Sequence, residues 1–167
     1  IFKNDFVSAS RHSVEIVDTA GNIVLSSDIN YVKPRISVGE KYFLVYDLAG
    51  YDFAVYNSFS VIYSERLDYP ISYAYMCDDG RLMVITKSED YRCVVIMYNK
   101  DYEQAYTWKT NDKYVFDGVL RSDGSFTLLC ASVADGSFDC VTVSGNMGSE
   151  DVTFSRIYKD TMGLQFN

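Results

Sequence analysis

Two stretches of the chain decide its fold: YMCDDGRLMVIT at residues 75–86 and VLRSDGSFTLLC at residues 119–130. Each holds an apolar run, an Asp-Gly pair and a second apolar run, and the second stretch repeats the first 44 residues later. Asp and Gly suit tight hairpin turns because both tolerate a positive φ. We therefore predict that Gly80 and Gly124 occupy equivalent turns, each between the innermost strand of a repeat unit and the strand that follows it.

Short apolar or alternating runs recur along the whole chain, and their period of two predicts β-strands rather than helices. The runs SVEIVD, FAVYN, VVIMYN and CVTVS fall into register at steps of 39, 42 and 45 residues. The turn glycines follow a similar period, at steps of 41 and 44 residues. A period of about 40–45 residues is typical of β-propeller blades. The positions taken as equivalent are Val17, Tyr56, Tyr98 and Val143 in the runs, and Gly39, Gly80 and Gly124 in the turns.

This period predicts an all-β fold, a β-propeller of about four blades of four-stranded antiparallel sheets. We expect one propeller or partial-propeller domain over residues 1–167. A β-sandwich with evenly spaced hairpins is the alternative, but a sandwich need not repeat its turns at one fixed period. The blades are expected at residues 1–29 (partial), 30–70, 71–114 and 115–160, with 161–167 starting or closing a blade.

The opening runs of the chain resemble the second, third and fourth strands of a blade, so the first blade lacks a strand. Either residues 161–167 supply that strand and close a small four-bladed ring, or the chain is an open arc cut from a larger propeller. We expect the arc. An arc leaves blade faces and strand edges bare, and these favour a homodimer with two-fold symmetry.

Charge and composition exclude several classes of function. The formal net charge of −8 and the pI near 4.5 would repel a phosphate backbone, so we expect no nucleic-acid partner. No stretch approaches about 18 consecutive apolar residues, so we expect no membrane contact from this segment itself. Aromatic residues make up 16% of the chain, which suits half-buried strands.

The four cysteines raise the questions of redox state and metal binding. No pair has the C-x-x-C spacing, and the chain has a single histidine, so the sequence predicts no zinc or haem site. Each cysteine falls within an apolar, strand-like run, where we expect a buried and reduced thiol. A cross-strand disulfide between Cys130 and Cys140 is the alternative, because both flank a predicted hairpin turn. The other two cysteines are Cys77 and Cys93.

We assign no catalytic, cofactor-binding or metal-binding residue, and we predict no cofactor. His12 lies at a predicted turn, where turn polarity accounts for it without catalysis. The stretch SVADGSFD at 132–139 resembles an anion nest or calcium turn, but a simple hairpin explains it better. Three pairs of carboxylates fall in or beside predicted loops and lack the D-x-D-x-D-G pattern of a calcium loop: Asp78–Asp79, Glu89–Asp90 and Glu150–Asp151.

Tyrosine is the sharper functional hint, with 15 in the chain. Exposed tyrosines can line a peptide or glycan surface, whereas buried ones fill the space between blades, and we favour the filling role. Trp108, on a predicted outer strand, is expected to pack between blades rather than to form a platform for a sugar. The tyrosines concerned are Tyr42, Tyr46, Tyr51, Tyr56, Tyr63, Tyr69, Tyr73 and Tyr75.

The strand-and-turn pattern of the chain resembles an uncharacterised family of propeller-like proteins found mostly in clostridial Gram-positive bacteria. The resemblance implies a single-pass membrane protein with an extracytoplasmic propeller and no assigned function. Relative to that pattern the chain lacks the anchor and several later strands, so we expect it to be a piece of a longer protein. The stretches that carry the resemblance are SVEIVDTAGNIVLS (13–26), RISVGEKYFLVYDLAGYDFAVYN (35–57), YMCDDGRLMVITKSEDYRCVVIMYN (75–99) and YVFDGVLRSDGSFTLLCASVADGSF (114–138).

These observations predict a non-enzymatic interaction or sensor module, located outside the cytoplasm and anchored to the membrane through a segment not present in this chain. Its partner is expected to be a protein or a glycan. The rival hypothesis is a glycan-acting hydrolase or lyase that uses carboxylates at one mouth of the propeller. Two inner-strand carboxylates facing each other across a cleft would favour that rival. Asp117 is the only carboxylate that the sequence assigns to an inner strand, and the rival mechanism needs two.

Overall fold

The computed structural model describes residues 1–134, 137–152 and 154–159. These residues form antiparallel sheets and no helix, which confirms the all-β prediction. The first sheet consists of β1 (Phe6–Ala9), β2 (Ser13–Val17) and β3 (Ile23–Asp28). The second consists of β4 (Pro34–Val38), β5 (Phe43–Asp47), β6 (Asp52–Tyr56) and β7 (Val61–Arg66). The third consists of β8 (Tyr73–Met76), β9 (Leu82–Thr86), β10 (Cys93–Tyr98) and β11 (Gln104–Thr110). The fourth consists of β12 (Lys113–Leu120), β13 (Ser125–Ala134), β14 (Ser137–Asn146) and β15 (Phe154–Tyr158).

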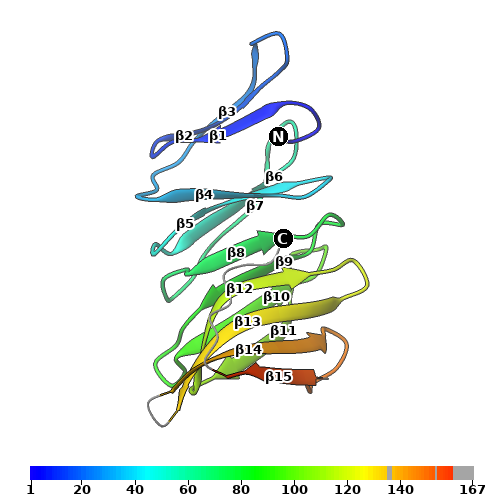
Figure 1. Cartoon of the computed structure of the whole chain (residues 1–167). Coiled ribbons are helices and arrows are strands. Elements are labelled where there is room, and N and C mark those ends of the chain that lie inside the picture. Colours follow the sequence, from blue (N-terminus) through cyan, green and yellow to red (C-terminus); the bar gives the residue numbers. More distant parts are fainter. Residues whose placement is uncertain (135–136, 153, 160–167) are drawn as a thin grey trace.

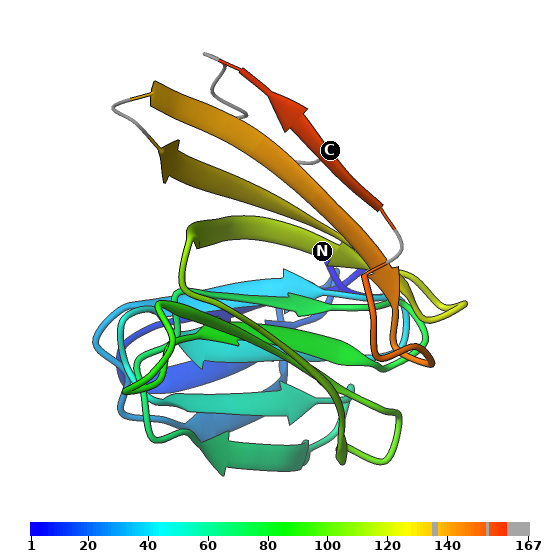
Figure 2. The same ribbon diagram turned by 90° about the horizontal axis from the view of Figure 1, so that it is seen from below.

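The sheets stack face to face in chain order, from β1–β3 at one end to β12–β15 at the other (Figure 1). The fourth sheet is inclined to the other three (Figure 2). Neighbouring sheets touch through their first strands, because β4 contacts β8 and β8 contacts β12. The first strands therefore form the inner side of the stack, as they do around the axis of a propeller.

The first sheet has three strands among the described residues, one fewer than each of the other sheets. The second strand of a sheet touches the first strand of the next one: β5 contacts β8, and β9 contacts β12. Since β1 contacts β4 in the same way, β1 is a second strand, and among the described residues no strand lies on its inner side. The predicted role of residues 161–167 in closing a ring lies outside the described residues. The predicted blade boundary at 114 falls inside β12, which begins at Lys113.

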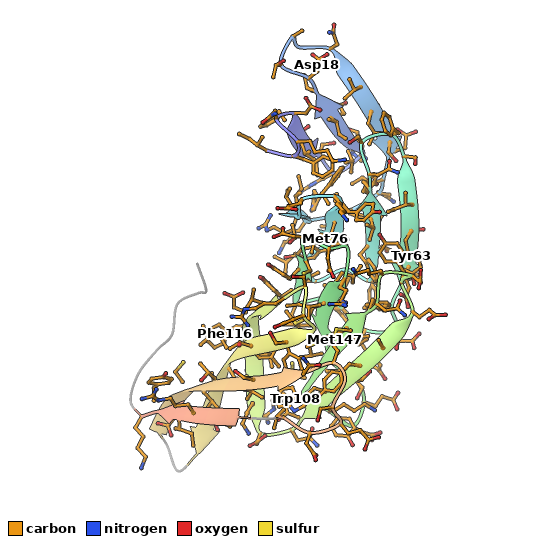
Figure 3. All side chains as sticks on the ribbon, turned by 90° about the vertical axis from the view of Figure 1, so that its right-hand side faces the viewer. Asp18, Tyr63, Met76, Trp108, Phe116 and Met147 are labelled. Atoms are coloured by element: carbon orange, nitrogen blue, oxygen red, sulfur yellow. The ribbon has the colours of Figure 1, made fainter. Side chains whose placement is uncertain are left out.

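Burial explains why some strands alternate in sequence and others do not. A strand in the middle of the stack has a sheet on each face, so every residue of β5 and of β9 is buried. The first sheet has one free face, and β2 alternates between buried and half-buried residues. Separate hydrophobic cores fill the spaces between successive sheets, as the side chains in Figure 3 show. The two-sided burial is why LMVIT reads as a continuous apolar run while SVEIVD alternates.

The Asp-Gly turns form as predicted. Gly80 and Gly124 each follow an inner strand, β8 and β12, and have φ values of 103° and 82°. In each turn the glycine N–H donates to the carbonyl three residues earlier, at Cys77 (3.1 Å) and Arg121 (2.9 Å). These are hairpin loops of three residues with a left-handed glycine in the last position. The repeat in the sequence is therefore a repeat in backbone geometry.

Gly39 is not equivalent to Gly80 and Gly124, so that part of the alignment was wrong. Its φ is not positive, and its N–H donates to Tyr42 O (2.9 Å) across a shorter hairpin loop. It stands where Cys77 stands in the third sheet, directly after the inner strand. A glycine is needed there for space, because a Cβ would lie 2.7 Å from the carbonyl oxygen of Cys77 in the next sheet.

A second repeated turn joins the third and fourth strands of the blades. Its first residue is Asp18, Asn57, Asn99 or Asn146, and its side-chain Oδ1 accepts backbone N–H groups from the turn. In the first three sheets the strand register shifts at the residue that precedes this turn, which is Val17, Tyr56 or Tyr98. Asn146 lies further along than the alignment through Val143 implies, because β14 extends to Asn146.

All four cysteines are free and buried. The alternative disulfide is excluded by the register of β13 and β14. Cys130 pairs with Val141 and Cys140 pairs with Ala131, so the two cysteines occupy adjacent positions and lie on opposite faces of the sheet. Cys77 lies just after β8, in the turn, rather than within a strand as predicted.

Candidate functional site

One end of the stack carries a cavity of about 410 Å³, which we call the inner pocket. It lies where the β5–β6 loop, the β9–β10 loop and the connection from β7 to β8 meet the start of β12. We call this end the loop end; the Asp-Gly turns lie at the other end. The volume falls in the usual range for small-ligand sites, about 300–1,000 Å³. The residues that line it are Leu48, Ala49, Pro70, Ile71, Ser72, Thr86, Lys87, Arg92, Cys93, Tyr114 and Val115.

Backbone hydrogen bonds hold the near wall of the inner pocket. The N–H of Ala49 donates to Ile71 O (2.8 Å), and the N–H of Ile71 donates to Gly50 O (2.7 Å). These bonds keep Ala49 at a φ of 63°, a backbone conformation that costs a residue with a Cβ about 1–3 kcal/mol. The methyl group of Ala49 is exposed at the pocket. The wall is therefore set before any ligand arrives.

A second set of contacts fixes the floor. The hydroxyl of Thr86 lies 3.1 Å from Tyr69 O and 3.0 Å from Pro70 O, and it holds the connection between the second and third sheets. Ile71 and Cys93 are buried, and burial raises the pKa of the Cys93 thiol. The thiol is therefore an apolar wall and not a nucleophile.

The charged side chains that line the inner pocket are both cations, Lys87 and Arg92. The guanidinium carbon of Arg92 lies 4.7 Å from the ring centre of Tyr114, whose side chain is half exposed. Neither cation lies within 4.0 Å of a carboxylate in the described part of the chain. Glu89 and Asp90 belong to the same β9–β10 loop, are exposed and do not line the pocket.

Other cavities are more polar and lie along the outer strands. One of about 550 Å³ separates β3 from β6 and β7, and one of about 330 Å³ separates β7 from β10 and β11. Two of the carboxylates there have partners: Asp52 pairs with Arg66 at 2.6 Å, and Glu65 accepts a hydrogen bond from the Tyr63 hydroxyl at 2.8 Å. A cavity of about 390 Å³ shares Leu48 and Ala49 with the inner pocket.

Asp117, the predicted inner-strand carboxylate, ties two sheets together. It is buried on β12, and its Oδ1 accepts the N–H of Gly118 at 2.8 Å. The hydroxyl of Tyr73 on β8 is hydrogen-bonded to the same carboxylate, and burial together with that bond raises the pKa of Tyr73. Asp47, the other buried carboxylate among the described residues, accepts the N–H of Lys33 at 2.7 Å. Both carboxylates thus hold the fold.

The remaining predicted positions lie apart from the inner pocket. His12 is exposed in the bend between β1 and β2. Within the described residues, no three His, Cys, Asp or Glu side chains group closely enough to hold a metal ion. In the stretch 132–139, residues 135–136 lie outside the described residues, while β13 and β14 on either side pair as antiparallel strands. The loop carboxylates Asp78, Glu89, Asp90, Glu150 and Asp151 are exposed, and Asp79 pairs with Arg81 (3.3 Å) and Lys100 (3.2 Å).

The tyrosines mostly fill space between sheets. Tyr46 and Tyr56 are buried, and Tyr42, Tyr63, Tyr73 and Tyr75 pack against the cores. Tyr69 is partly buried beside the 330 Å³ cavity, and Tyr51 is exposed. Trp108 packs against the core between the third and fourth sheets. Figure 3 shows Tyr63 and Phe116, on an inner strand, on opposite sides of the stack.

The inner pocket was missed by sequence reasoning. Its residues come from four separate segments, 48–49, 70–72, 86–93 and 114–115, and most are apolar residues beside strand ends. Nothing distinguishes such residues from ordinary core in the sequence. The positive φ of Ala49, which marks the wall, has no sequence signal either. None of the described residues forms a helix able to span a membrane.

Comparison with known proteins places the fold. A family model described as "Family of unknown function (DUF5711)" matches residues 1–150. The structure is similar to that of BamB from Moraxella catarrhalis, a β-propeller, with a TM-score of 0.51 at 9% sequence identity. The similarity covers 92% of this chain and 62% of the BamB chain, so this chain spans less than two thirds of that length. No curated protein matches the sequence.

Proposed function

Because the chain belongs to the DUF5711 family, whose function is unknown, we propose its function from the geometry: a non-enzymatic interaction or sensor module that binds its partner at the loop end. One observation carries the proposal. The inner pocket is mostly apolar, its wall is held by backbone bonds, and its charged lining groups in the described part of the chain are Lys87 and Arg92. A preformed apolar site with a few polar groups at its rim is suited to recognition.

The lining also argues against the rival, a glycan-acting hydrolase or lyase. Glycoside hydrolysis requires a pair of carboxylates about 5–10 Å apart, one of them with a raised pKa. Among the residues that the structure describes, no carboxylate and no histidine lines the inner pocket. Side-chain hydrogen bonds lower the pKa of Asp18, Asp112 and Asp123, which is opposite to the shift that a general acid requires.

We propose further that the module lies outside the cytoplasmic membrane, on a longer membrane-anchored protein of a Gram-positive bacterium. The resemblance of its strands and turns to the clostridial propeller-like proteins supports this location. Alkaline phosphatase fused after the propeller in the parent protein tests it, because that enzyme folds only outside the cytoplasm. Active fusions are expected, and inactive fusions with a stable chain would place the module in the cytoplasm.

Photo-crosslinking tests the interaction function. Benzoylphenylalanine replaces Tyr114, at the rim of the inner pocket, or Phe59, which is exposed in the β6–β7 turn at the opposite end. In cells that make the parent protein, we expect a discrete adduct from position 114 and none from position 59. The result that contradicts the proposal is no adduct at position 114, or the same adducts at both positions.

A further inference from the structure

We propose that the inner pocket recognises a peptide segment in which an apolar or aromatic side chain stands next to an acidic side chain. This inference rests on the proposed function and names the chemistry of its partner. The apolar side chain enters the pocket, and the carboxylate meets Lys87 and Arg92 at the rim.

The apolar half of the proposal follows from the lining. Leu48, Pro70, Ile71 and Val115 present hydrocarbon to the cavity, and the ring of Tyr114 closes one side. An apolar group that enters such a space leaves water, which favours binding in proportion to the area covered. A polar side chain would find few partners there, because the Thr86 hydroxyl is already bonded to Tyr69 O and Pro70 O.

The acidic half follows from charge. In a chain with a net charge of −8, both charged groups that line the pocket among the described residues are positive, and neither lies within 4.0 Å of a described carboxylate. A guanidinium stacked on a ring keeps its N–H edges free to donate to a carboxylate. Arg92 on Tyr114 is therefore held ready beside the apolar cavity. Glu89 and Asp90 belong to the same loop and reduce the local positive field, but they are exposed and do not line the pocket.

The carboxylate is expected to come from a side chain and not from the end of a chain. Capture of a terminal carboxylate uses free backbone N–H groups. At this wall those groups are occupied: Leu48 N donates to Lys33 O (2.9 Å), Ala49 N to Ile71 O (2.8 Å) and Gly50 N to Asp47 O (2.9 Å). The N–H of Arg92 donates to Asn111 Oδ1 (3.0 Å). The side chains of Lys87 and Arg92 are the charged donors that line the pocket for the ligand.

The test uses the whole chain, labelled with ¹⁵N, and three small probes followed by NMR. The probes are N-acetyl-Phe-Glu-amide, its Phe-Gln counterpart and its Ser-Glu counterpart. Binding of so small a probe is expected at about millimolar concentration. We expect Phe-Glu to shift the amide signals of 48–50, 71–72, 86–93 and 114–115. Phe-Gln and Ser-Glu are each expected to bind more weakly than Phe-Glu, by a factor of about ten or more.

Two variants complete the experiment. Arg92→Gln is expected to weaken Phe-Glu about tenfold and to leave Phe-Gln unchanged. Lys41→Gln removes the same charge at an exposed position in the β4–β5 turn, at the opposite end, and is expected to change neither. The three probes are compared with one another on the unsubstituted chain, so that comparison holds even if a variant folds poorly.

Several results would overturn the proposal. They are the absence of shifts, shifts centred elsewhere, and equal binding of Phe-Glu and Phe-Gln. Stronger binding of N-acetyl-Glu, with its free terminal carboxylate, than of Phe-Glu would replace the side-chain source with a chain end. If unlabelled protein shifts the same signals, the occupant is a second copy. A failure here together with a discrete adduct at position 114 would reject this chemistry while leaving the interaction function in place.

Discussion

Four glycine-to-alanine substitutions separate the two reasons for which this fold needs glycine. Gly21→Ala and Gly124→Ala test backbone conformation alone, because both glycines have a positive φ, and a Cβ would have open space at Gly21 and only ordinary contact with Asn146, at 3.5 Å, at Gly124. Gly39→Ala tests space alone, because its φ is not positive but a Cβ would lie 2.7 Å from Cys77 O. Gly80→Ala combines both, with φ at 103° and a Cβ 2.9 Å from the Tyr42 ring.

The magnitudes follow from these geometries. A positive φ at alanine costs about 1–2 kcal/mol relative to glycine. Overpacking against a neighbour that cannot move costs about 1–3 kcal/mol. We therefore expect a loss of about 1–2 kcal/mol for Gly21 and Gly124, about 1–3 for Gly39, and about 2–4 for Gly80. The excess of Gly80 over Gly124 measures the packing of the second sheet on the third.

Urea unfolding, followed by far-ultraviolet circular dichroism, measures these losses. With a slope of about 2 kcal/mol per molar urea, Gly80→Ala is expected to lower the midpoint by about 1–2 M at an unchanged slope. The reasoning about the turns is refuted if Gly21→Ala and Gly124→Ala leave the midpoint unchanged. The reasoning about packing is refuted if Gly80→Ala costs no more than Gly124→Ala, or if Gly39→Ala is neutral.

Three further predictions concern thiols, phenols and self-association. The four buried thiols are expected to react with a thiol reagent only on unfolding, and burial raises the pKa of Cys130 to about 12. Fewer than four reactive thiols in denaturant would reveal a disulfide. Burial raises the pKa of Tyr63 and Tyr102 from 10.0 to about 12, so the unfolded chain releases protons that the folded chain keeps. Stability present below about pH 10 should therefore fall as the pH rises toward 12, and equal urea midpoints at roughly pH 9 and pH 11 would contradict this. Phe6 and Ile23, 62% and 60% exposed on the free face of the first sheet, are expected to support a homodimer. Light scattering should show a dimer for the unsubstituted chain and a monomer for the Phe6→Ser, Ile23→Ser double variant. An unsubstituted chain that is already monomeric would contradict the association.

Local features of the fold could be predicted because they are written in adjacent residues. Asp-Gly pairs identify the turns of Gly80 and Gly124, since few residue types adopt a positive φ. Gly39 misled the alignment, because a glycine needed for conformation and a glycine needed for space look the same in sequence. Its reason lies in the next sheet, at Cys77 O. The choice between a disulfide and free thiols at Cys130 and Cys140 likewise depended on register, which decides the face of each residue.

The candidate site could not be predicted because it depends on contacts between distant segments. Tyr114 and Arg92 meet only when the third and fourth sheets stack. Ala49 adopts its conformation because Ile71, 22 residues along the chain, accepts the N–H of Ala49 and donates its own N–H to Gly50 O. In contrast, the filling role of the tyrosines was favoured correctly, because chains rich in strands bury aromatic rings between sheets. The sequence shows which residue types are available, and the stacking decides which of them line a cavity.

Competition at the photo-crosslinker tests the central claim, that this propeller binds a partner in its inner pocket. The parent protein with benzoylphenylalanine in place of Tyr114 is irradiated in the presence of excess N-acetyl-Phe-Glu-amide or N-acetyl-Phe-Gln-amide. We expect the adduct to disappear with the Phe-Glu probe and to persist with the Phe-Gln probe at the same concentration. An adduct that neither probe displaces, or that both displace equally, would contradict it.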